Sequence, residues 1–236
     1  MDVNRRVGAI DCGRRVGAID CGTNSIRLLI ADAVDAKLRD VHREMRIVRL
    51  GQGVDATGRF APEALARTES ALADYAELMA EHSVSAVRMV ATSAARDADN
   101  RDEFFAMTAR LLGPVVTGTV AEVITGAEEA ELSFRGAVGE LDAATGPFVV
   151  VDLGGGSTEL VLGAAAVQAS FSADIGCVRL TERCLHSDPP TAAEIAGADE
   201  DCAASALHAL AARQDRMRAA GRRCRRRGKR AAAPRS

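Results

Sequence analysis

Residues 148–163 read FVVVDLGGGSTELVLG, and residues 16–31 follow the same plan as VGAIDCGTNSIRLLIA. In each stretch an apolar run precedes a turn and a second apolar run follows it, which is the pattern of a β-hairpin. Aligning the two turns pairs Asp20 with Asp152, Gly22 with Gly154, and Ser25 with Ser157. The shared Asp-x-Gly-x-x-Ser pattern predicts two related lobes, each beginning with the same hairpin.

The sequence between the hairpins alternates between strand and helix patterns. Pro62 suits the first turn of a helix, and the apolar residues Leu65, Leu72 and Met79 that follow it have helical spacing. The predicted elements are a strand within 38–50, a helix at 62–81, a strand at 84–91, a helix at 101–112, a strand at 115–124 and a helix at 127–141. This order predicts an α/β lobe with a mixed sheet over residues 14–143.

The remaining segments differ in character from that lobe. RRVGAIDCG occurs twice in tandem from residue 5, and only the second copy continues into the hairpin, so residues 1–13 are predicted to be a duplicated extension. After an AATGP boundary, residues 147–212 are expected to form a partial second lobe with a helix starting near Thr191. Residues 213–236 are rich in arginine, lack apolar periodicity and are predicted to be disordered.

The composition is that of a soluble globular protein, with 236 residues of which 47% are apolar and 27% charged. No stretch approaches 18 consecutive apolar residues, so no membrane association is expected. Eleven of the 30 basic residues lie in 213–236, which leaves residues 1–212 with 19 basic and 32 acidic side chains. An acidic body with only 3% aromatic residues is not expected to bind nucleic acid.

The six cysteines show neither a CxxC pair nor zinc-binding spacing with histidine. The N-terminus lacks the apolar core and cleavage site of a secretion signal. Reduced thiols and a cytoplasmic location are therefore expected.

The glycine-rich turn suggests how such an acidic chain could bind an anion. Gly154, Gly155 and Gly156 have no Cβ atoms, so their N–H groups can approach a phosphate closely and their φ angles can be positive. Ser157 and Thr158 add hydroxyl donors. One such sequence can also be no more than a tight turn, but two of them facing each other would hold neighbouring phosphates in a cleft.

Asp20 and Asp152 each end a predicted strand where it meets its turn. A carboxylate beside a phosphate is repelled unless a cation intervenes, and Mg²⁺ is commonly bound through one or two carboxylates, waters and phosphate oxygens. The alternative is that each aspartate caps its own turn.

Other charged residues near the turns also have two interpretations. Glu128 and Glu129 open a predicted helix, where they either complement the helix dipole or include the base that deprotonates an attacking water. Glu159, just after the glycine turn, could share that role or bind the metal. Arg27 and Arg96 would either neutralise a phosphate chain or form surface ion pairs.

Six separated segments resemble the exopolyphosphatase and guanosine pentaphosphate phosphohydrolase family, the Ppx/GppA phosphatases. They follow the family's order over roughly residues 14–185. The segments are AIDCGTNSIRLL (18–29), RLGQGV (49–54), ATSAARDADN (91–100), ITGAEEA (124–130), VVDLGGGSTELVLG (150–163) and GCVRLTER (176–183). The resemblance implies the α/β fold of the actin-like ATPase superfamily, with a ribonuclease-H-like lobe and, in this chain, an incomplete second lobe.

The resemblance also implies Mg²⁺-dependent hydrolysis of the terminal phosphate of inorganic polyphosphate or of guanosine pentaphosphate (pppGpp). The implied catalytic carboxylate falls in Glu128–Glu129, with Glu129 favoured, and Asp152 and Glu159 match carboxylates around the metal and water. Asp20 is a further expected metal ligand. The implied substrate-binding residues are Asp20, Gly22, Thr23, Asn24, Ser25, Arg27, Ser93, Arg96, Gly154, Gly155, Gly156, Ser157 and Thr158.

Several alternatives accompany this hypothesis. The family's further Gly/Thr-containing loop is not found after residue 185, so the chain is expected to be truncated at its C-terminus. A pppGpp phosphohydrolase, a non-catalytic binder of guanosine tetra- or pentaphosphate and an inactive fragment therefore remain open, and a homodimer is allowed. Nucleic-acid binding by residues 213–235 and a sugar kinase of the same superfamily are less favoured, the latter because no adenosine-binding loop is recognised.

Overall fold

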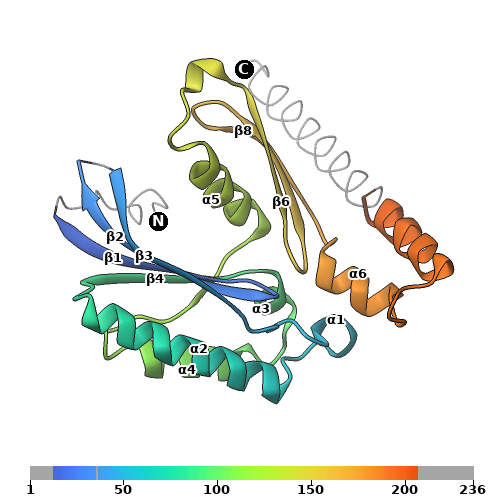
Figure 1. The fold of residues 1–236 in the computed structure, drawn as a ribbon, viewed down its shortest axis with the longest axis horizontal. Coiled ribbons are helices and arrows are strands. Elements are labelled where there is room, and N and C mark those ends of the chain that lie inside the picture. The colour runs from blue at the N-terminus through green and yellow to red at the C-terminus, as the bar shows by residue number, and fades with distance from the viewer. Residues whose placement is uncertain (1–12, 36, 207–236) are drawn as a thin grey trace, which may run out of the picture.

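The computed structural model describes residues 13–35 and 37–206 and contains two β-sheets (Figure 1). The strand order is β3-β2-β1-β4-β5 in the first sheet and β6-β7-β8 in the second. The strands are β1 (Arg14–Cys21), β2 (Ser25–Val34), β3 (Lys37–Ile47), β4 (Ala86–Ala91), β5 (Glu122–Val123), β6 (Phe148–Leu153), β7 (Thr158–Gly163) and β8 (Val167–Ala173).

The first sheet is mixed, as predicted. Strands β1, β2 and β3 pair antiparallel, whereas β4 and β5 extend the sheet in parallel from β1. Helices α2 and α4 cover one face (Figure 1), and α2 begins with Pro62 in its first turn. The core between this sheet and the two helices contains the buried residues Ile19, Leu28, Tyr75 and Phe104. The helices of this part are α1 (Val54–Thr57), α2 (Pro62–Glu81), α3 (Ser93–Asp97) and α4 (Arg101–Leu112).

The second sheet is antiparallel throughout and is covered by α5 (Gly126–Val138) on one face. Ala130 and Phe134 of α5 form a small core with Val161. Helix α5 lies within the range predicted for the first lobe, yet its buried residues pack against the second sheet. The chain continues through a short 3-10 turn (Ala143–Thr145) before β6, and through α6 (Cys177–Cys184) and a helix over 192–206 after β8.

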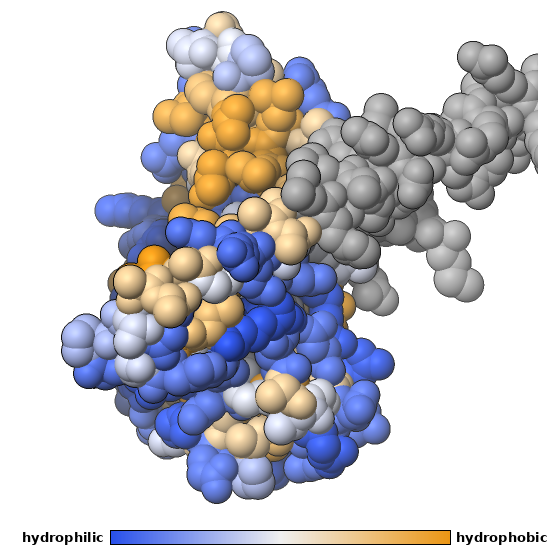
Figure 2. Space-filling view, turned by 90° about the vertical axis from the view of Figure 1, so that its right-hand side faces the viewer, coloured by the Kyte–Doolittle hydropathy of each residue, from blue (hydrophilic) through white to orange (hydrophobic). Residues whose placement is uncertain are grey.

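The opposite face of the second sheet is apolar and exposed (Figure 2). We refer to the large apolar side chains of β6 and β7 on this face as the open face. They are Val149, Val151, Leu153, Leu160 and Leu162, which are 38–78% exposed.

The prediction of a strand at 115–124 was wrong over most of that range, because only Glu122–Val123 pair with β4. The N–H groups of Val115 and Val116 donate instead to the carbonyl of Leu112, and Gly118 has a φ of 82°, so the chain turns back after α4. The hairpins and the other predicted strands and helices of residues 14–163 are confirmed, with shifted ends. Strand β8, helix α6 and the short helices α1 and α3 were not predicted from the sequence.

Strand β1 is formed by the second copy of the RRVGAIDCG repeat. The extension predicted at 1–13 and the tail at 213–236 lie outside the described residues, apart from Gly13. The four described cysteines are free, and the described helices include none with the length and apolarity needed to span a membrane.

Candidate active site

The two hairpin turns meet across a cleft of about 160 Å³. The turn between β1 and β2 supplies one wall and the glycine turn between β6 and β7 supplies the other. The lining residues are Asp20, Gly22, Thr23, Asn24, Ser25, Arg27, Thr92, Ser93, Glu129, Asp152, Leu153, Gly154, Gly155, Gly156, Ser157 and Cys177.

Both turns close with the same backbone hydrogen bond. The N–H of Gly22 donates to the carbonyl of Ser25, and the N–H of Gly154 donates to that of Ser157, each over 2.9 Å. The expected pairing of the two turns is therefore present in three dimensions as well as in sequence.

Gly154, Gly155 and Gly156 do not adopt the positive φ angles that their sequence allowed. They are needed for close approach: a Cβ on Gly156 would lie 2.6 Å from the hydroxyl oxygen of Ser93 and 2.8 Å from that of Thr23. A Cβ on Gly155 would lie 3.0 Å from Cβ of Thr23. The turn is thus packed directly against the first lobe, with no space for a side chain between them.

Three carboxylates face this cleft, and their environments differ. Burial raises the pKa of Asp20, an effect opposed by Arg27 at 3.2 Å and increased by repulsion from Asp152. Burial also raises the pKa of Glu129, although Arg96 donates to its Oε2 over 2.8 Å. Asp152 accepts a 2.7 Å hydrogen bond from the hydroxyl of Ser133 in α5. The site therefore concentrates negative charge and holds each carboxylate in place.

Glu159 lies in β7 below the glycine turn and does not line the cleft. It is only 1% exposed and accepts a 2.8 Å hydrogen bond from the hydroxyl of Ser172 in β8. Burial, followed by repulsion from Glu129, raises its pKa to about 7.

Three other candidates lie outside the cleft lining. Glu128 is exposed and pairs with Arg88 at 3.1 Å, while its backbone N–H is capped by the hydroxyl of Thr125. The hydroxyl of Thr158 donates to a backbone carbonyl in the loop before α6. Arg96 reaches the site through Glu129, because its guanidinium bridges that carboxylate and the carbonyl of Ile124.

Two residues near the cleft were not predicted to have a role. Cys177 lines the cleft, and the Nε of Arg179 donates to the carbonyl of Gly156 over 2.9 Å. Both lie in GCVRLTER (176–183), one of the six segments that resemble the Ppx/GppA family. The four-residue spacing of Arg179 and Arg183 places two guanidiniums on one helix face. This spacing was the sequence signal that could have indicated their role.

The carboxylates fit one kind of metal site. Among the residues the structure describes, no group of three or more His, Cys, Asp or Glu side chains forms a metal cage. Mg²⁺ commonly needs only one or two protein carboxylates, with waters and substrate phosphates completing its shell. Asp20 and Asp152 line the same cleft and repel each other, so they fit an ion shared with a phosphate substrate.

Comparison with known proteins shows the family of the chain. The family model described as "Ppx/GppA phosphatase family" matches residues 29–226. The chain belongs to the Ppx/GppA phosphatase family. Exopolyphosphatase 2 of Mycobacterium tuberculosis H37Rv is 74% identical to it over 197 residues, which cover 82% of this chain and 59% of that relative. The chain therefore spans less than two thirds of the length of this curated relative.

Solved Ppx/GppA structures share the fold. A crystal structure of an exopolyphosphatase-like protein is 47% identical, with a TM-score of 0.77 over 84% of this chain and 61% of the other. The Aquifex aeolicus family member is 39% identical, with a TM-score of 0.61 over 77% of this chain and 58% of the other. The chain thus has the α/β fold of solved Ppx/GppA proteins, the family whose resemblance implied an actin-like ATPase fold.

Proposed function

We propose that the cleft between the two turns hydrolyses the terminal phosphate of inorganic polyphosphate. One observation carries this proposal: both Asp-x-Gly-x-x-Ser turns line a single cleft together with Glu129. A linear chain of phosphates is the kind of ligand that would extend from one turn to the other, because each turn offers backbone donors and hydroxyls to an anion. The related protein of M. tuberculosis carries the name exopolyphosphatase.

Glu129 is the proposed general base. Its raised pKa brings it closer to neutral pH, where a carboxylate accepts a proton from water more effectively. Arg96 fixes its orientation through the bond to Oε2. In the proposed step the water oxygen bonds to the terminal phosphorus while its proton passes to Glu129. The bond from that phosphorus to the bridging oxygen breaks, which releases orthophosphate and a chain one phosphate shorter.

Asp20 and Asp152 are proposed to hold Mg²⁺ beside the phosphates. The ion would supply positive charge that offsets repulsion between the substrate and these carboxylates. Ser133 orients Asp152 from outside the cleft, and Arg27 orients Asp20 from the edge of the cleft. The cytoplasmic location and the homodimer expected from the sequence stay predictions.

Orthophosphate release from polyphosphate tests the proposal, with Glu129→Gln compared against Glu128→Gln. We expect Glu129→Gln to lower kcat by about 10²–10⁴-fold, the usual contribution of a general base. Glu128→Gln is the matched control, because the adjacent carboxylate is exposed and pairs with Arg88 away from the cleft. Its rate should stay within about threefold of the wild type. Equal rates for Glu129→Gln and the wild type would remove Glu129 from the mechanism.

Two further arms of this assay test the metal dependence and the substrate. Removing Mg²⁺ with a chelator should abolish phosphate release, and adding the ion back should restore it. Replacing polyphosphate with pppGpp should give slower release from its 5′ end. Calorimetric binding of either compound by wild-type protein that releases no phosphate would identify a non-catalytic binder instead.

A further inference from the structure

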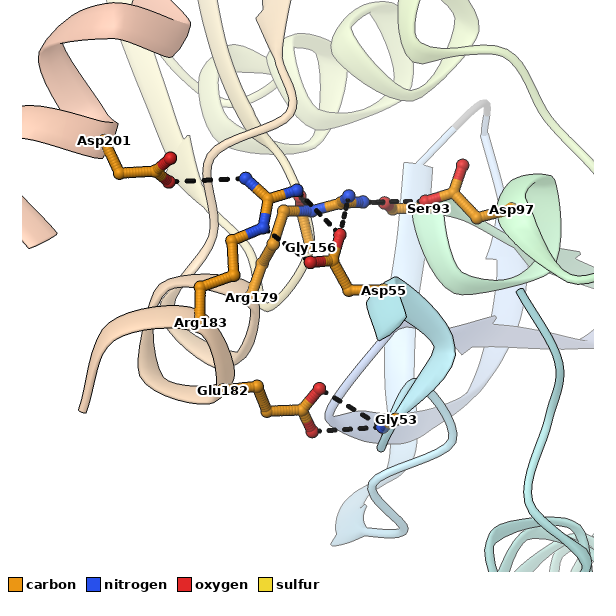
Figure 3. Close-up of polar contacts among 9 residues, drawn as sticks. All are labelled: Gly53, Asp55, Ser93, Asp97, Gly156, Arg179, Glu182, Arg183 and Asp201. Carbon is orange, nitrogen blue, oxygen red and sulfur yellow. Dashed lines mark hydrogen bonds and ion pairs between the residues drawn. The ribbon is translucent and has the colours of Figure 1, made fainter. Parts of the chain in front are cut away.

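Helix α6 of the second lobe lies against α1 and α3 of the first lobe. Arg179 lies at the centre of this contact (Figure 3). Its Nε donates to the carbonyl of Gly156 over 2.9 Å, and its Nη1 donates to Oδ1 of Asp55 over 2.5 Å. Its Nη2 donates to Oδ2 of Asp97 over 2.7 Å and lies 3.4 Å from the hydroxyl of Ser93. The Arg179 side chain is only 12% exposed.

We infer that Arg179 is a positioning residue, which orients the backbone of the Gly154–Gly156 turn toward the substrate and fixes that turn against the first lobe. The inference deepens the proposed function and rests on it for the identity of the substrate. Arg179 does not line the cleft, so it would act through the turn and not on the phosphates directly.

The backbone hydrogen bonds of α6 support this role. The N–H of Cys177 donates to the carbonyl of Gly154 over 3.1 Å, and the N–H groups of Val178 and Arg179 donate to that of Gly155 over 2.9 and 3.1 Å. With the Arg179 side chain on Gly156, all three glycine carbonyls accept hydrogen bonds from α6.

Peptide planarity turns this arrangement into an orientation of the donors. In a trans peptide the C=O and the following N–H point in opposite directions. Because α6 holds the three carbonyls on its own side, the N–H groups of Gly155, Gly156 and Ser157 point away from α6. The same residues line the cleft. The bond from Arg179 to Gly156 fixes the last of these peptide units, and it is the one bond in the set made by a side chain.

Arginine suits this position because its planar guanidinium donates in several fixed directions at once. Asp55 and Asp97 compensate its charge at the buried contact, which allows the remaining N–H to reach the turn. A lysine could keep one charge contact, but its single ammonium cannot reach Gly156, Asp55 and Asp97 together.

Arg183, one helical turn later, provides a matched control. Its guanidinium bonds both oxygens of Asp55 over 2.5 and 2.8 Å and Asp201 over 3.3 Å, but it makes no bond to the glycine turn (Figure 3). Arg183→Gln and Arg179→Gln therefore both weaken the contact between α6 and α1. Only Arg179→Gln removes the bond to Gly156.

The test compares wild type, Arg179→Gln, Arg179→Lys and Arg183→Gln in the full chain. Backbone order parameters at residues 154–157 are measured by NMR relaxation without ligand, and KM and kcat are measured for polyphosphate. Both glutamine variants should lower Tm. In Arg179→Gln the order parameters of the turn should fall below about 0.6, while those of Arg183→Gln should stay near the rigid-backbone value of about 0.85. KM should rise about tenfold or more in Arg179→Gln, with a smaller change in kcat. Arg179→Lys should keep most of the Tm but not the high order parameters.

Equal order parameters at residues 154–157 in Arg179→Gln and Arg183→Gln would overturn the inference, as would a KM for Arg179→Gln equal to that of Arg183→Gln. A wild-type protein that releases no orthophosphate would contradict the proposed function separately. In that case lower order parameters confined to the turn of Arg179→Gln would still support the positioning role, because that measurement needs no substrate.

Discussion

The two hairpins share a turn but bury opposite faces. Leu28 in β2 is 1% exposed, whereas the aligned residue of β7, Leu160, is 41% exposed. The same contrast holds between Ile19 in β1, at 2%, and Val151 in β6, at 54%. In the first lobe α2 and α4 cover the face that carries Leu28, while in the second lobe α5 covers the other face (Figure 1).

This difference shows that the sequence pattern of the turn does not determine which contacts stabilise the turn. The first turn extends from strands inside a five-stranded sheet with a large core. The second extends from strands β6 and β7, whose open face has no described helix against it. It is held instead from the side, by α6 through Arg179 and by Thr23 and Ser93 of the first lobe. The same sequence pattern is therefore stabilised by core packing in one lobe and by contacts between lobes in the other.

The sharpest test of this contrast replaces the aligned leucines. Leu28→Ala should lower the free energy of unfolding by about 2–5 kcal/mol, because it leaves a cavity among fully buried side chains. Leu160→Ala removes a side chain that already contacts solvent and should cost about 1 kcal/mol. Urea titrations followed by circular dichroism measure both values. Equal losses would mean that the open face of the second sheet is covered in solution.

The second test compares the aligned glycines of the turns. A Cβ on Gly154 would lie 2.7 Å from the carbonyl oxygen of Ser157, whereas a Cβ on Gly22 would lie 3.5 Å from that of Ser25. Gly154→Ala must therefore shift backbone, at a cost of about 1–3 kcal/mol, and should also weaken polyphosphate binding. Gly22→Ala needs no such shift and should stay within about 0.5 kcal/mol of the wild type.

Thermal unfolding and binding calorimetry on both variants check this prediction. A larger loss for Gly22→Ala than for Gly154→Ala would show that the first turn is the more tightly packed of the two. Neither glycine has a positive φ, so backbone strain from a left-handed conformation does not complicate the comparison.

The sequence predicted the parts of the molecule that depend on short-range patterns. The hairpins followed from alternating apolar runs around Asp20 and Asp152, and the aligned turns predicted that both would contribute to one cleft. The buried face of each hairpin could not be predicted, because both faces of β7 carry apolar residues and the position of α5 decides between them. The contact of Arg179 with Asp55 joins residues 124 positions apart, which no local pattern encodes. The apolar run at 115–124 predicted a strand, but Gly118 within it has a positive φ and turns the chain, so only its last residues pair with β4.

The smallest expected effect concerns the position where the hairpins differ in charge. Arg27 faces the uncovered side of the first sheet, while the aligned Glu159 lies under α5 with a pKa raised to about 7 from its ordinary value of 4.5. Between these two pH values the folded protein retains a proton that the unfolded chain has released. The contribution of Glu159 to stability is therefore present below about pH 4.5 and is lost as pH rises through 7.

Glu159→Gln should remove this loss, since a neutral amide can still accept the hydrogen bond from Ser172. Its Tm should match the wild type near pH 5 and exceed it near pH 8, by the equivalent of about 1 kcal/mol, the cost of a buried charge that is incompletely paired. Glu140→Gln, at an exposed carboxylate beyond the end of α5, serves as the control and should follow the wild-type curve at both pH values. A Tm difference between Glu159→Gln and wild type that shrinks as pH rises would mean that Glu159 is ionised and well paired in the folded protein. The burial of opposite hairpin faces would then no longer explain its environment.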